Sequence, residues 1–139
     1  MSRIGTLIAN ARDPFYSLEF FPPADKAQLP DFYANVERLR ALSPLFVSVT
    51  YGAGGAKQDN TLAITGELVR RGFVVMAHLT CVGATAERIV CFLRDLKSVG
   101  ANNILALQIH HRFHAVSCIL PGNFSRLLFD DHIGLDAGS

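Results

Sequence analysis

Glu19 stands in the middle of an apolar run, Ser17-Leu18-Glu19-Phe20-Phe21, which two prolines end. Burying an unpaired carboxylate costs several kcal/mol or keeps the group protonated. A protonated carboxylic acid at the end of a buried strand is well suited to donate a proton in a reaction. The residues alone leave two interpretations of Glu19 open, a general acid and a structural ion pair with an Arg or Lys.

Further candidate residues follow the next two apolar segments. Thr50 and Tyr51 precede a glycine-rich stretch, Gly52-Ala53-Gly54-Gly55, and His78 lies inside an apolar segment. Each of these features also has a purely structural interpretation. Thr50 and Tyr51 are β-formers at a strand end, and the glycine-rich stretch is an ordinary βα loop. His78 is a buried histidine with satisfied hydrogen bonds. The loop lacks the lysine and hydroxyl residue of a P-loop, which excludes a Walker site and leaves close approach to a flat ring as its functional interpretation.

Two kinds of segment alternate along the chain and must position these residues. Short apolar segments rich in β-branched or aromatic residues predict strands over residues 15–21, 45–51, 73–79 and 103–107. Segments with a helical period lie between them. Their inward positions are Phe32, Val36 and Leu39 in the first, Leu62, Leu68 and Val69 in the second, and Ile89, Phe92, Leu93 and Leu96 in the third.

The order βαβαβαβ, with strand starts about thirty residues apart, predicts a parallel α/β layer with right-handed crossovers. Both an open doubly wound sheet and part of a (β/α)8 barrel fit this order. Candidate polar residues at the ends of three successive strands favour the barrel, which gathers groups from several strands around one mouth. No GxGxxG follows any strand, so a Rossmann dinucleotide site is unsupported.

Composition excludes several other classes of protein. The chain has 139 residues, half of them hydrophobic, and a formal net charge of +1. The dispersed basic residues argue against nucleic-acid binding, and no apolar run is long enough to span a membrane. Three cysteines without CxxC spacing and the absence of a signal-like start predict a reduced, cytoplasmic protein.

The tail, residues 108–139, breaks the pattern. It holds four of the five histidines and shows no clear helical or strand period. His110, His111 and His114 lack an acidic or thiolate partner at a convincing spacing, so we predict no metal site.

Four motifs in order, SLEFFPP, PLFVSVTYGAGG, MAHLTCVGAT and NNILAL, resemble the methylenetetrahydrofolate reductase family over residues 15–107. The resemblance implies a (β/α)8 TIM barrel that binds FAD and reduces 5,10-methylenetetrahydrofolate to 5-methyltetrahydrofolate with NADH or NADPH. By the same resemblance Glu19 is the general acid that opens the five-membered ring of the folate. Residues that would bind the cofactors are Thr50, Tyr51, Ala53, His78, Leu79 and Thr80.

The resemblance stops at residue 108, where the family continues with Arg-Gly-Asp-Pro-Pro. This chain has Gln108-Ile109-His110-His111-Arg112, which CAG ATC CAC CAC CGN can encode. Skipping two bases gives Asp-Pro-Pro-Pro. We therefore divide the chain into an N-terminal half of a reductase-type barrel, residues 1–107, and a divergent tail, residues 108–139, that a frameshift would place out of frame.

About four βα units are expected where a barrel needs eight. A half barrel leaves strand edges unpaired and its inner face open, which predicts weak or absent activity for the chain alone. The alternative function is a non-catalytic interaction fragment that pairs its open edges with a second copy or with another half barrel. In neither case do we expect a nucleic-acid or membrane partner.

Overall fold

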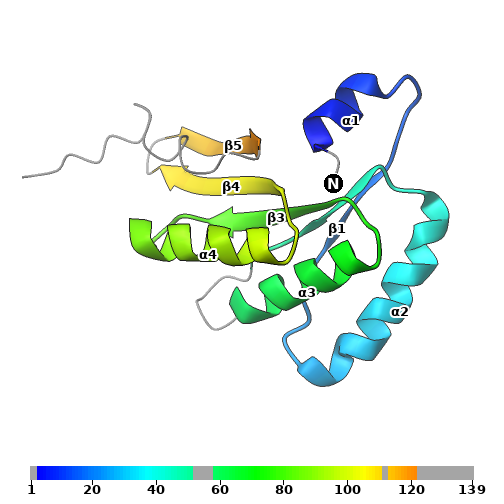
Figure 1. Ribbon diagram of the computed structural model, residues 1–139, viewed down its shortest axis with the longest axis horizontal. Helices are drawn as coiled ribbons and strands as arrows, with labels where there is room; N and C mark the ends of the chain where they lie inside the picture. The colour runs from blue at the N-terminus through cyan, green and yellow to red at the C-terminus, as the bar shows by residue number, and fades with distance from the viewer. Residues whose placement is uncertain (1–2, 52–57, 111–112, 122–139) are drawn as a thin grey trace, which may run out of the picture.

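The computed structural model describes residues 3–51, 58–110 and 113–121, which form a single five-stranded sheet with helices on both faces (Figure 1). The strand order follows the chain, β1 to β5. The first four strands are parallel, which confirms the predicted α/β sheet; they are β1 (Ser17–Phe20), β2 (Phe46–Val49), β3 (Val75–Thr80) and β4 (Asn103–His110).

Three helices connect successive parallel strands and cover one face of the sheet (Figure 1). They are α2 (Leu29–Leu39), α3 (Gln58–Arg70) and α4 (Ala86–Ser98), and short 3-10 turns at Lys26–Gln28 and Arg40–Leu42 flank α2. The Thr85 side chain accepts a hydrogen bond from the Arg88 N–H and thereby caps the start of α4. None of the helices among the described residues is long and apolar enough to cross a membrane.

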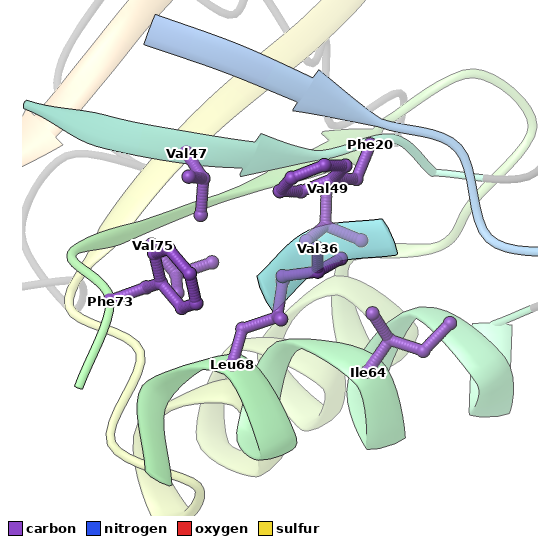
Figure 2. Close-up of a cluster of buried hydrophobic side chains, with 8 residues drawn as sticks. All are labelled: Phe20, Val36, Val47, Val49, Ile64, Leu68, Phe73 and Val75. Carbon is purple, nitrogen blue, oxygen red and sulfur yellow. The ribbon is translucent and has the colours of Figure 1, made fainter. Parts of the chain in front are cut away.

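The core lies between the sheet and these helices. Figure 2 shows one cluster, in which strand residues face helix residues: Phe20, Val36, Val47, Val49, Ile64, Leu68, Phe73 and Val75. A second cluster joins β3, β4 and α4 and contains Ala77, Leu79, Phe92, Leu93, Leu96, Ala101 and Ile104. Successive side chains of a strand point to opposite faces. The residues between these core positions therefore face away from α2, α3 and α4, on what we call the inner face.

A short helix not predicted from the sequence, α1 (Ile4–Asn10), lies on the inner-face side of the sheet (Figure 1). The Ile4 side chain is fully buried, and the Ile4 N–H donates a hydrogen bond of 3.0 Å to Asn103 Oδ1 at the start of β4. Because Asn103 sits on β4, this bond fixes the beginning of the helix to the sheet. A seven-residue helix has too short a period to stand out in the sequence.

The tail also contributes a strand that the sequence analysis did not predict. β5 (Phe113–Pro121) pairs antiparallel with β4, with Ile104 opposite Leu120. The expectation that a half barrel leaves its strand edges unpaired is therefore wrong at β4, which pairs with β5. At the other edge of the sheet, β1 pairs with β2 alone among the strands of the described residues.

Leu68 tests the core. It is fully buried between α3 and the sheet, whereas Leu42 is 47% exposed. Leu68→Ala should lower the free energy of unfolding by about 2–5 kcal/mol, because a large-to-small change leaves a cavity. Leu42→Ala is the matched control, with an expected change of about 0.5 kcal/mol or less. Urea unfolding followed by circular dichroism measures both, and equal losses would contradict this packing.

Candidate functional site

The parallel strands end at one common edge of the sheet, and the candidate polar residues lie there on the inner face. Glu19, Ser48 and Met76 are register partners on β1, β2 and β3. His78 lies two residues beyond Met76 and is paired with Leu105 of β4. Parallel pairing thus brings residues that are far apart in the sequence onto one surface.

Glu19 and His78 meet across this surface. Glu19 Oε1 lies 3.7 Å from His78 Nδ1, and this is the contact on which the site is built. The Glu19 side chain is 48% exposed. Our expectation that Glu19 is buried among apolar residues is therefore wrong. Its neighbours Leu18 and Phe20 point to the helices, as strand alternation requires, and β1 is an edge strand.

His78 is buried, with 8% of its surface exposed. Burial lowers the pKa of its imidazole below the ordinary value of 6.5, and the nearby Glu19 carboxylate opposes that shift. The imidazole is therefore mainly neutral at neutral pH. Its contact with Glu19 becomes an ion pair only as the pH falls.

Thr50 lies just past β2, and both its backbone N–H and its backbone carbonyl form hydrogen bonds. The Thr50 N–H donates to the Phe20 carbonyl at 3.0 Å, and its carbonyl accepts a hydrogen bond of 3.2 Å from Thr61 Oγ1 on α3. These bonds fix the chain where the glycine-rich loop begins. Thr80, at the end of β3, lies on the same side of its strand as His78 and is half-buried.

Two predicted cofactor-binding residues have their side chains in the helix layer instead. The Tyr51 ring packs edge-on against Phe92 of α4, with 5.4 Å between centroids, and burial raises the pKa of its phenol. Leu79 is 3% exposed and belongs to the core cluster with α4. At these two positions the backbone, and not the side chain, is nearer the inner face. Ala53 lies outside the described residues.

Ser48 is the residue that sequence reasoning missed. It lies on the inner face of β2, where it is the register partner of Glu19 on β1 and of Met76 on β3, and it is 7% exposed. The only signal in the sequence is a small polar residue inside the apolar strand FVSV. Among the described residues there is no group of three or more His, Cys, Asp or Glu side chains that could hold a metal ion.

The sheet, its three crossover helices and the shared strand edge define part of a (β/α)8 barrel. The model of the methylenetetrahydrofolate reductase family matches residues 3–110, so the chain belongs to this family. Similar proteins include 5,10-methylenetetrahydrofolate reductase of Salmonella typhimurium, 39% identical over 93 residues, which are 66% of this chain and 31% of that protein. The Escherichia coli protein of the same name has the same identity and coverage.

Plant proteins are also similar. The probable methylenetetrahydrofolate reductase (NADH) of rice is 36% identical over 109 residues, which are 78% of this chain and 18% of that protein. The chain thus spans about a third of the length of the bacterial relatives and less of the plant ones.

His78 makes the stability of the fold depend on pH. Its pKa is lower in the folded chain than its ordinary 6.5, so the unfolded chain binds more protons in the window below pH 6.5. The free energy of unfolding should therefore fall as the pH drops below 6.5 and level off below the folded pKa. His78→Gln should remove this part of the slope. Urea unfolding at several pH values measures it, and identical slopes in the two proteins would contradict the assignment.

Proposed function

We propose that this chain carries the proton-donating part of a flavin-dependent reductase that converts 5,10-methylenetetrahydrofolate to 5-methyltetrahydrofolate, with NADH or NADPH as the electron donor. Family membership supports the reaction class. The observation that carries the proposal is the approach of Glu19 to His78 on the inner face, at the ends of the parallel strands. Ligands of barrel enzymes bind at this end.

The inner face has the chemistry that one side of a flavin ring needs. His78 and Thr80 provide polar atoms, and their register partners Leu105 and Leu107 provide half-buried apolar surface. A flat, mostly apolar ring with polar edges fits such a mixed lining. His78, Thr80 and Thr50, with the backbone at Tyr51 and Leu79, are the groups proposed to hold FAD. When bound, the flavin would supply the hydride.

The role proposed for Glu19 is to deliver a proton. Its carboxyl group would protonate the folate nitrogen whose bond to the methylene carbon breaks, which opens the five-membered ring. Half-exposure leaves the carboxyl group accessible to a substrate on the inner face, and the neutral His78 ring beside it adds no positive charge at neutral pH. Glu19 and His78 would therefore bind and orient the folate, and Glu19 would protonate it.

Glu19→Gln tests this role. Where the purified chain binds flavin, NADH should bleach the flavin in both the wild type and the variant. The weak reduction of the methylene folate expected for the chain alone should be lost in the variant, since Gln cannot donate the proton. Glu87→Gln is the matched control, because Glu87 is an exposed glutamate in the first turn of α4. Equal loss of flavin bleaching and folate reduction in Glu19→Gln would contradict the role.

A second candidate function is a non-catalytic fragment that pairs its free strand edge with another chain. It is favoured by β1, which has a partner on one side only within the described part of the chain. Exposed aromatic side chains flank β1, Tyr16 at 65% and Phe21 at 69%. A defined dimer on size exclusion, without flavin absorbance, would support this function over the first.

We also propose that the family-like part ends at residue 107 and that the tail is read out of frame. The match to the family model ends at residue 110, close to this boundary. The DNA after codon 107 should encode Asp-Pro-Pro when two bases are skipped. An intact frame whose tail is shared by related genes would contradict this proposal.

A further inference from the structure

The contact between Glu19 and His78 spans an entire strand. β1 and β3 are separated by β2, so their backbones lie about 10 Å apart in a sheet with ordinary strand spacing. The two side chains nevertheless bring Glu19 Oε1 within 3.7 Å of His78 Nδ1. They can do so only by crossing the inner face of β2.

The β2 side chain beneath this crossing is Ser48. It is the register partner of Glu19 on one side and of Met76 on the other, in the row adjoining His78. Its neighbours Val47 and Val49 point to the helix layer, so Ser48 points to the inner face. It is nevertheless only 7% exposed, which means that other groups cover it.

From this geometry we infer that Ser48 is a positioning residue: its small side chain leaves the room above β2 in which the Glu19 carboxylate and the His78 imidazole meet. A larger side chain at this position would fill that room and separate the two groups. The importance of the pair for catalysis rests on the proposed function, but the contact itself does not require it.

Among the residues whose side chains the structure describes, the elements around the two groups carry no other charged neighbour. β2 (Phe46–Val49), residues 103–107 of β4 and α1 (Ile4–Asn10) contain no charged or titratable side chain. Within the described part of the chain, Glu19 is the charged group that acts on the pKa of His78, and it raises that pKa against the lowering effect of burial. The titration of His78 therefore reports whether the carboxylate is near.

The test follows the His78 ring by NMR through a pH titration of the full chain, without flavin or folate. In Glu19→Gln the titration midpoint should fall below that of the wild type, because the carboxylate that favours the charged ring is gone. Ser48→Leu should lower the midpoint as well, by separating the pair. Ser48→Ala, which keeps the position small, should leave it at the wild-type value.

The double variant Ser48→Leu/Glu19→Gln separates loss of contact from added burial. If Ser48 acts through the contact between Glu19 and His78, Ser48→Leu should lower the titration midpoint of His78 when Glu19 is present. The same substitution should change the midpoint little once Glu19 is replaced by Gln. An equal fall in both backgrounds would show that the leucine merely buries the ring, and would overturn the inference. So would a wild-type midpoint in Ser48→Leu.

Circular dichroism checks that each variant folds. If Ser48→Leu does not fold, Ser48→Val replaces it in the same titration. Because the titration needs neither cofactor nor substrate, its outcome is independent of the Glu19→Gln assay for folate reduction. A chain that binds no flavin could still show the coupled titration, and an active chain could lack it.

Discussion

Alternation of side chains along parallel strands is the constraint on which the site depends. Phe20, Val49 and Ala77 are consecutive register partners that point into the helix layer. Because they do, Glu19 and His78 must point to the other face. A slip of one residue in the pairing of β1 would bury the carboxylate among the helices and expose Phe20, which the hydrophobic effect strongly disfavours. Packing of the outer layer thus determines where the acid lies.

Much of this arrangement could be predicted from the sequence. Short apolar runs predicted the four parallel strands, and the helical period of the segments between them predicted the three crossover helices. Such signals are local and strong. The direction of individual side chains was harder to predict. Tyr51 and Leu79 lie in motifs typical of the family, but their side chains contact α4, and only the register of the sheet reveals this.

The surroundings of Glu19 were predicted incorrectly for a physical reason. Apolar neighbours in the sequence do not surround a strand residue in space, because the neighbours point to the opposite face. On an edge strand the inner position is half open, as the 48% exposure of Glu19 shows. β5 escaped prediction for another reason: its pairing with β4 depends on a distant segment, and the sequence of the tail has no clear period of its own.

The most direct test of this account is a through-space NMR contact between the side-chain methylene protons of Glu19 and the ring protons of His78 in the full chain. The account predicts a clear nuclear Overhauser effect between them, with none from His78 to the core residues of α4. Contacts from the His78 ring to Phe92 or Leu96, and none to Glu19, would contradict it.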